Sequence, residues 1–260
     1  MLMLRASIGG AFFVYGLILT SPAYAGSCDE GLSRSDADIR YVHDGDTVFL
    51  TDGRKLRLVG LDTPELARDE RPAEPFAVLA RDELRRLVGE LTGVHLLFDA
   101  ERRDRYGRLL AHVLLEDGRN ITRIMLMRGL AVMLIVPPNH LNTECYQAAE
   151  RYARERRLGI WQLPGFQAIP SESLTPSDRG YRIVTGRIVR IGHGGTFVWL
   201  NLAGGLALRI AAADLGTFKS LNLEGLLGQT IEARGYLTQR HGELRMRIRH
   251  PYALTVHPDY

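Results

Sequence analysis

The chain has 260 residues, of which 45% are hydrophobic and 24% charged, with a formal net charge of +3. This is enough apolar material for two modest cores and more than a single small domain needs. The presence of only two cysteines excludes a zinc site built from cysteine thiolates. The overall charge indicates no class of partner, but residues 181–260 hold ten Arg and Lys against five Asp and Glu, so the C-terminal part is basic.

The first residues have the pattern of an export signal. Arg5 lies near the start, an apolar run extends from Gly9 to Leu19, and Ala23-Tyr24-Ala25 forms a small-x-small cleavage site. The apolar run is short for a membrane span, and the alternative is an uncleaved anchor. We therefore predict a signal peptide over 1–25 and an exported protein, periplasmic or secreted, without stable membrane association after cleavage.

Cys28 and Cys145 both remain after cleavage, in a compartment that permits disulfides. A bridge between them would pin an N-terminal extension, residues 26–38, to the domain that follows. Two independent thiols are the alternative, because a distance in space cannot be read from a spacing in sequence.

Residues 39–163 predict one domain. Apolar residues alternate from Ile39 to Leu61 around a turn at Asp52-Gly53, which is typical of a β-hairpin. Apolar residues that recur every three or four positions predict an amphipathic helix over 73–91. Two strands follow, and then come two helices that begin at Asn120 and at Asn142-Thr143 and end at glycines.

Residues 164–180 are rich in proline and serine and lack apolar periodicity, so they predict a linker. In residues 181–260 short alternating runs return. They predict about five strands with one helical or irregular piece between the third and the fourth, which is the order of an OB-like Greek-key barrel.

Charged side chains gather at strand ends of the first domain. Converging carboxylates would repel one another unless a cation joined them, and carboxylate oxygens favour Ca²⁺ or Mg²⁺ over zinc. Arginines suit a phosphate, because the guanidinium donates two hydrogen bonds to paired oxygens. This combination indicates phosphodiester hydrolysis. The residues are Asp44, Asp46, Arg57, Asp62, Glu65, Asp104, Arg105 and Arg108.

The motifs "DGDT", "RLVGLDTPE", "DRYGRLLAHV", "RGLA" and "LGIW" occur in this order over residues 39–163. In order and spacing they resemble the signatures of the staphylococcal nuclease (thermonuclease) family. The resemblance implies an α+β domain, mainly β, with a five-stranded OB-type barrel and three helices, next to the second, smaller OB-like barrel. It also implies Ca²⁺-dependent cleavage of DNA or RNA that leaves 3′-phosphates.

By this resemblance, Asp46, Asp62 and the Thr63 carbonyl would bind the calcium ion, and Glu65 would be the general base. Arg57 and Arg108 would hold the scissile phosphate, and Tyr106 and Arg105 would border the nucleotide pocket. Well-known members also present aromatic side chains after the "GLA" segment, where this chain has Ile135 and Pro137.

Two strands of the second barrel are candidates for nucleic-acid binding. Phe197 and Trp199 share one strand face and could stack on unpaired bases. Arg245, Arg247 and Arg249 share a face that could follow phosphates. The alternative is that the aromatic residues pack on the first domain and that the arginines form a solvated face.

The sequence thus predicts an exported, monomeric, Ca²⁺-dependent nuclease whose partner is nucleic acid, preferably single-stranded. One rival is a catalytically inactive nuclease-like module of the cell envelope that binds nucleic acid or protein. A structural protein of the cell envelope is the other, if the N-terminal segment stays uncleaved.

Overall fold

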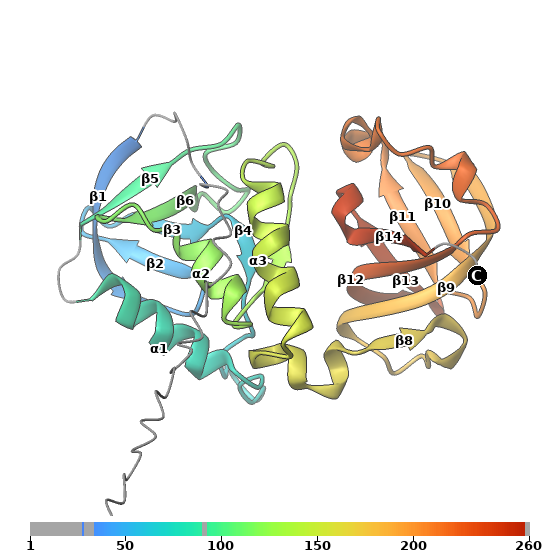
Figure 1. Cartoon of the computed structure of the whole chain (residues 1–260), viewed down its shortest axis with the longest axis horizontal. Helices are drawn as coiled ribbons and strands as arrows, with labels where there is room; N and C mark the ends of the chain where they lie inside the picture. The colour runs from blue at the N-terminus through green and yellow to red at the C-terminus, as the bar shows by residue number, and fades with distance from the viewer. Residues whose placement is uncertain (1–27, 29–33, 90–92, 258–260) are drawn as a thin grey trace, which may run out of the picture.

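The structure is a computed structural model that describes residues 28, 34–89 and 93–257. The predicted signal peptide, residues 1–25, lies outside these ranges. Among the helices of the described residues, none is long and apolar enough to cross a membrane. Two β-barrels stand side by side in Figure 1, and helix α3 (Thr143–Glu155) lies between them.

The first barrel is closed, and its neighbouring strands are, in order, β1 (Arg34–Val42), β2 (Thr47–Leu50), β3 (Lys55–Leu58), β6 (Leu109–Leu115) and β5 (Gly93–Leu97). All neighbours are antiparallel except β3 and β6, which run parallel. Along β3, Leu56 and Leu58 are buried while Lys55 and Arg57 are only partly covered. This alternation lets one strand supply the core on one face and polar groups on the other.

The barrel begins at Arg34, before the domain start predicted at Ile39. The first half of β1 pairs with β5, from Arg34 opposite Leu97 to Asp38 opposite Gly93. Most side chains in this half are polar and exposed, so no apolar alternation marks it in the sequence. The predicted N-terminal extension, residues 26–38, therefore supplies part of a barrel strand.

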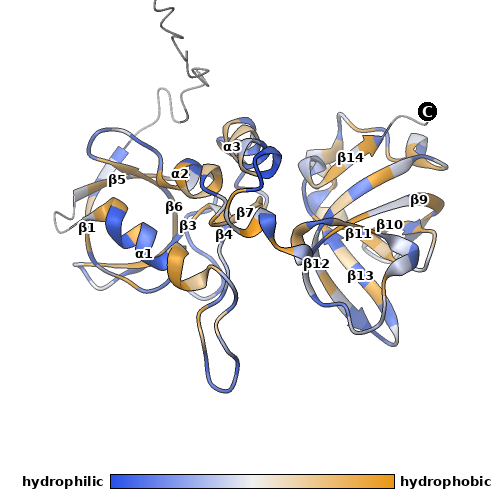
Figure 2. Cartoon of the chain, turned by 60° about the horizontal axis from the view of Figure 1, so that its bottom comes forward, coloured by the Kyte–Doolittle hydropathy of each residue, from blue (hydrophilic) through white to orange (hydrophobic). Residues whose placement is uncertain are grey.

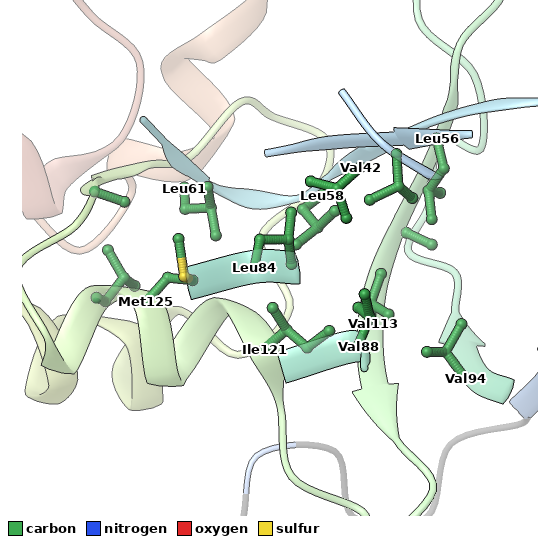
Figure 3. Close-up of a cluster of buried hydrophobic side chains, with 14 of the residues drawn as sticks. Val42, Leu56, Leu58, Leu61, Leu84, Val88, Val94, Val113, Ile121 and Met125 are labelled. Carbon is green, nitrogen blue, oxygen red and sulfur yellow. The ribbon is translucent and has the colours of Figure 1, made fainter. Parts of the chain in front are cut away.

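Helices α1 (Ala77–Val88) and α2 (Ile121–Met127) close one side of this barrel. Figure 3 shows Leu84 and Val88 of α1 and Ile121 and Met125 of α2 in one cluster with barrel side chains. Helix α1 is shorter than the predicted range 73–91. The apolar steps continue beyond both ends of the helix, but the preceding residue, Phe76, has a left-handed backbone with a φ of 70°.

A short two-stranded ribbon joins the barrel to the helices. In it, β4 (Gly60–Asp62) pairs antiparallel with β7 (Val132–Leu134), and Asp62 lies opposite Val132. The ribbon starts at Gly60, where φ is +88° and a Cβ atom would collide with the Tyr146 ring. Glycine is therefore required for β4 to pass close to α3 and carry Asp62 to the end of the barrel.

Residues 164–180, predicted as a linker, contain two 3₁₀ turns and strand β8 (Ala168–Pro170). Strand β8 runs parallel to β9 (Gly180–Gly194), so part of this segment is an edge of the second sheet. A three-residue strand that ends in proline has no apolar alternation, which explains why its composition reads as a linker.

The second barrel has the predicted order of elements, and the α+β prediction of two barrels is confirmed. Its strands are β9, β10 (Phe197–Leu202), β11 (Ala207–Ala211), β13 (Glu243–Ile248) and β12 (Thr230–Arg240), with β14 (Leu254–His257) at the edge. Pairing of β12 with β9 closes the ring. Two 3₁₀ segments, Ala212–Phe218 and Glu224–Leu226, lie between β11 and β12, the third and fourth barrel strands in chain order, where an irregular piece is predicted.

A small apolar cluster and a buried ion pair join the two barrels. Val132 and Ala153 from the first half cluster with Tyr181 and Ile183 of β9. Beside this cluster an Arg234 Nη atom lies 2.8 Å from an oxygen of Glu150, and the two side chains are 6% and 1% exposed. Figure 2 shows β12 as the strand of the second barrel that approaches β7. Each barrel thus has its own buried core, and the two pack against each other through this third, smaller cluster.

Candidate active site

Residues from three strand ends converge at one end of the first barrel. Asp46 closes the turn between β1 and β2, Arg57 lies on β3, and Asp62 ends β4. Gly45 makes the convergence feasible, because a Cβ there would lie 2.8 Å from the Thr63 side chain and 2.8 Å from that of Ala80. A larger residue would push the turn, and Asp46 with it, away from the other two strands.

Asp46 is a buried carboxylate with many polar neighbours. It is 3% exposed, and its Oδ1 accepts hydrogen bonds from the Thr47 hydroxyl at 2.8 Å and from an Arg57 Nη atom at 2.7 Å. Its Oδ2 accepts weaker bonds, each at 3.3 Å, from the backbone N–H and hydroxyl of Thr63. The backbone N–H of Asp46 donates in turn to Asp44.

Arg57 bridges the two predicted carboxylate ligands. Its two terminal nitrogens bind Asp46 and Asp62 respectively, and its side chain is 18% exposed. Burial alone would lower the pKa of Arg57, but the charges of Asp46 and Asp62 outweigh it and raise the pKa above the usual value. Arg57 therefore stays charged and offsets the repulsion between the carboxylates.

Burial raises the pKa of Asp46 to about 7, although Arg57 lowers it, and the charges of Asp62 and Asp44 raise it further. A carboxylate in this setting needs more positive charge than one arginine supplies. The site thus has an excess of buried negative charge close to neutral pH.

Glu65 lies at the exposed edge of the same cluster. Its backbone N–H donates to a Glu74 carboxylate oxygen at 2.9 Å, and its carbonyl accepts from the Glu74 backbone N–H at 2.9 Å. Partial burial raises the pKa of Glu65, and the charges of Asp62 and Asp44 act in the same direction. A carboxylate with a raised pKa is a better acceptor for a proton from water.

Arg108 is not bonded to this cluster. Its Nε donates to Asp104 at 2.6 Å on the loop before β6. The strand register nevertheless places Arg108 on the same face as Arg57. Leu110 of β6 pairs with Arg57, and Arg108, two residues before Leu110, shares its face. Tyr106 is 68% exposed on the same loop, and the guanidinium of Arg105 lies 4.8 Å from its ring centre.

One contact of the site comes from the second barrel. The hydroxyl of Tyr236 on β12 donates a hydrogen bond to Oδ2 of Asp62. The residue as a whole is 41% exposed, but its hydroxyl is enclosed beside Asp62. Burial of the hydroxyl and the Asp62 charge raise the pKa of Tyr236, so the hydroxyl keeps its proton. Sequence reasoning missed Tyr236. Alternation along "ARGYLTQ" marks it as outward-facing, but no local signal tells which neighbour it meets.

The site fits a hard divalent cation. Asp46, Asp62 and the carbonyl of Thr63 offer oxygen ligands, which Ca²⁺ and Mg²⁺ prefer. The buried charge of Asp46 gives a physical reason for a cation there. In the described part of the chain, no group of three or more His, Cys, Asp or Glu side chains lies placed to hold a metal ion, so this site depends on two carboxylates and the backbone.

The predicted aromatic and arginine residues of the second barrel form one surface. Trp199 of β10 pairs with Arg209 of β11, which pairs with Arg247 of β13, so these side chains leave the barrel on the same side. The guanidinium of Arg209 lies 5.4 Å from the Phe197 ring centre, and that of Arg245 lies 5.2 Å from the Trp199 ring. We call this set the arginine–aromatic surface: Phe197, Trp199, Arg209, Arg245, Arg247 and Arg249.

This surface carries more positive charge than its carboxylates offset. Arg245 binds Glu243 at 2.7 Å. Arg247 and Arg249 share one carboxylate, Asp214, at 2.8 and 3.7 Å. Burial lowers the pKa of Arg209, and repulsion from Arg247 and Arg245 lowers it further. Among the described residues, the Nε atoms of Arg209, Arg245 and Arg249 lack hydrogen-bond partners. Sequence reasoning missed Arg209, although alternation with Leu208 and Ile210 could have identified its face.

The structure joins Cys28 and Cys145 in a disulfide, with Cα atoms 5.9 Å apart. Cys145 lies on α3, so the bond attaches the segment before β1 to the helix between the barrels.

Comparison with known proteins gives the family. Residues 55–163 match the family model described as "Staphylococcal nuclease homologue". The thermonuclease of Staphylococcus intermedius is 34% identical over 127 residues, which are 48% of this chain and 74% of that protein. The thermonuclease of Staphylococcus hyicus is 36% identical over 124 residues, 46% of this chain and 72% of that protein. Endonuclease YncB of Bacillus subtilis is 34% identical over 128 residues, 47% of this chain and 60% of that protein.

The barrel, its helices and these similarities define the class as a phosphodiester-hydrolysing nuclease. The chain belongs to the staphylococcal nuclease family. The matched family region includes Arg57, Asp62, Glu65 and Arg108, and it ends before the second barrel.

Proposed function

We propose that the protein is an exported, Ca²⁺-dependent nuclease that cleaves DNA or RNA and leaves 3′-phosphates. The observation that supports this most strongly is the bridge of Arg57 between Asp46 and Asp62, beside Glu65. In this arrangement two carboxylates would bind the ion, the Arg57 guanidinium would bind the phosphate, and Glu65 would accept a proton. The ligands of the ion would be Asp46, Asp62 and the Thr63 carbonyl.

A bound Ca²⁺ would polarise the phosphoryl oxygen of the scissile phosphate. With Asp46 and Asp62 bound to the ion, Arg57 would be free to donate two hydrogen bonds to that phosphate. Glu65 would accept the proton of a water molecule as the water oxygen forms its bond to phosphorus and the bond to the 5′ oxygen breaks. Arg108 would bind the phosphate from the same face as Arg57 and stabilise charge on the leaving oxygen.

The substitution Glu65→Gln tests the proposed base. We expect kcat on single-stranded DNA to fall about 10²- to 10⁴-fold in the presence of Ca²⁺, the usual contribution of a general base. Glu70→Gln is the matched control, because Glu70 is an exposed acid on the same loop. Full activity of Glu65→Gln would disprove the assignment. Absence of cleavage by the unsubstituted protein with any divalent cation would favour the alternative, an inactive module that binds nucleic acid or protein.

We further infer that the arginine–aromatic surface holds single-stranded substrate, with bases on Phe197 and Trp199 and phosphates on the arginines. Charge and partly covered rings support this use over a purely solvated face. Tyr106 and Arg105 would contact the nucleotide at the catalytic end.

This inference is tested by the double substitution of Arg245 and Arg247 to Ala. We expect KM for single-stranded DNA to rise, and the slope of log KM against log salt concentration to decrease by about 0.7 for each lost phosphate contact. Arg187→Ala is the control, because it removes an exposed arginine on β9 whose side chain donates to the Gly228 carbonyl. Point substitutions are preferable to removal of the barrel, which would expose the apolar cluster between the barrels. Unchanged KM and slope would contradict this use of the surface.

Export is supported by the sequence pattern of residues 1–25 and by the disulfide at Cys28, since disulfides persist in oxidising compartments. N-terminal sequencing of protein recovered outside the cytoplasm should give a start at Gly26. A start at Met1 would contradict cleavage.

A further inference from the structure

Asp62 is held by both barrels. One carboxylate oxygen, Oδ1, accepts a hydrogen bond from Arg57 of the first barrel, and Oδ2 accepts one from Tyr236 of the second. Since Asp62 ends the short strand β4 and its side chain is 17% exposed, these two donors determine how its carboxylate is rotated without a bound ion. Tyr236 is the donor that would remain on Asp62 when Arg57 binds the phosphate. A metal ligand needs such support, because a freely rotating carboxylate presents its oxygens to the ion only part of the time.

The position of Tyr236 is itself fixed by the contact between the barrels. Its ring packs edge-on against Tyr181 at 5.6 Å, and Tyr181 stacks on Phe166 at 5.8 Å. Two residues earlier on β12, Arg234 forms the buried ion pair with Glu150 of α3. Side chains two apart on a strand share a face, so the ion pair aims Tyr236 at the first barrel.

Tyr236 also connects the active site with the arginine–aromatic surface. Leu237 pairs with Met246, so the antiparallel register brings Tyr236 beside Arg247 on the outer face of the sheet. The outer face of β12, from which Tyr236 contacts Asp62, therefore continues into the arginine–aromatic surface. Docking of the second barrel thus has a direct effect at the catalytic end.

We propose that Tyr236 is a positioning residue for Asp62, so that the second barrel completes the cation site of the first. This rests on the proposed role of Asp62 as a calcium ligand. Tyr236 orients Oδ2 through its hydroxyl and contributes no bond to substrate. The active site is then formed by two barrels, although the family model matches residues of the first half alone.

The test is Ca²⁺ binding to the full chain without substrate, measured by titration calorimetry for Tyr236→Phe. The substitution removes one hydroxyl and keeps the ring that packs on Tyr181. We expect the Kd for Ca²⁺ to rise about tenfold, at the lower end of the effect of removing a partner of a metal ligand. Tyr41→Phe is the matched control, because Tyr41 is 46% exposed and Tyr236 41%, and Tyr41 lies on β1. Its Kd should equal that of the unsubstituted chain.

Kinetics separate positioning from substrate contact. For Tyr236→Phe we expect lower kcat at limiting Ca²⁺, recovery at saturating Ca²⁺, and an unchanged KM for single-stranded DNA. A KM that stays raised at saturating Ca²⁺ would overturn the proposal in favour of a substrate contact. An unchanged or tighter Kd would overturn it directly. Tm values of both variants verify that each is folded.

The variant Asp62→Asn distinguishes this inference from the proposed function beneath it. If Asp62→Asn loses Ca²⁺ affinity while Tyr236→Phe does not, only the positioning role fails. If the unsubstituted chain does not bind Ca²⁺, or if Asp62→Asn binds it equally well, the proposed cation site fails as well.

Discussion

At the scale of single residues, the site depends on one buried carboxylate beside more exposed ones. Asp46 is almost fully buried and owes its charge to Arg57, while Asp62 and Asp44 oppose that charge. The motif "DGDT" identifies Asp46 in the sequence, but its burial cannot be read there. It follows from the closing of Thr47 and Thr63 around the carboxylate.

The raised pKa of Asp46 predicts how stability depends on pH without divalent cations. The ordinary value is 3.8 and the value in the folded protein about 7, so the folded state binds a proton more tightly than the unfolded state. The stabilisation is complete below pH 3.8 and is lost as the pH rises toward 7, by at most about 1.4 kcal/mol per pH unit. Urea unfolding with a chelator between pH 4 and 8 measures it.

Asp46→Asn should remove this component, since an amide does not titrate in the range. The difference in unfolding free energy between the two proteins should therefore change with pH in the stated direction. If both proteins show the same pH dependence, Asp46 does not titrate near neutral pH.

At the scale of elements, the helices α2 and α3 begin where the sequence predicts, but only one of them has the predicted side-chain cap. Asn120 begins α2, as predicted, and its side chain accepts from the Arg123 backbone N–H at 3.0 Å. Asn142 precedes α3, as predicted, but its backbone is left-handed with a φ of 61° and its side chain makes no cap. One residue type thus begins two helices by different means, which spacing alone does not distinguish.

We expect Asn120→Ala to lower the free energy of unfolding by about 1–2 kcal/mol, because it removes the cap of α2. Asn120 also donates to the Tyr146 hydroxyl at 3.0 Å. Asn120→Ser separates the two effects, since serine caps as well as asparagine but is too short to keep that second bond. Urea unfolding should rank the proteins as unsubstituted, Ser, then Ala. Equal stability of Ser and Ala variants would show that the cap contributes little.

At the scale of the whole molecule, the structure differs from two domains on a flexible tether. The barrels share the cluster around Trp161 and Tyr181, and Glu150 accepts from both Arg234 and the Met133 backbone N–H. The Tyr252 hydroxyl, in the second half, also donates to the Met133 carbonyl. We therefore expect the barrels to unfold in one cooperative transition.

Arg234→Leu should lower the free energy of unfolding by about 3–5 kcal/mol, because it leaves Glu150 buried without its charged partner. Adding Glu150→Gln should restore a large part of the lost free energy of unfolding, since glutamine is neutral and its side-chain oxygen can still accept from the Met133 backbone N–H. The exposed pair of Arg54 and Asp52 provides the control, and Arg54→Ala should cost about 1 kcal/mol or less. Calorimetry measures all three. An effect of Arg234→Leu as small as that of the control would contradict a tight interface.

The sequence by itself indicated the family, the order of elements in both barrels and the charged residues that lie together at one end of the first barrel. These properties are local: Asp46, Arg57, Asp62 and Glu65 lie within one hairpin and the strand that follows it, where alternation and turn residues fix the backbone. Only the tertiary structure decided which outer face of the second barrel meets the first, and that Tyr236 reaches Asp62 across 174 positions of sequence. The physical reason is that docking depends on the shape and charge of complete surfaces, to which each residue contributes without a local pattern of its own.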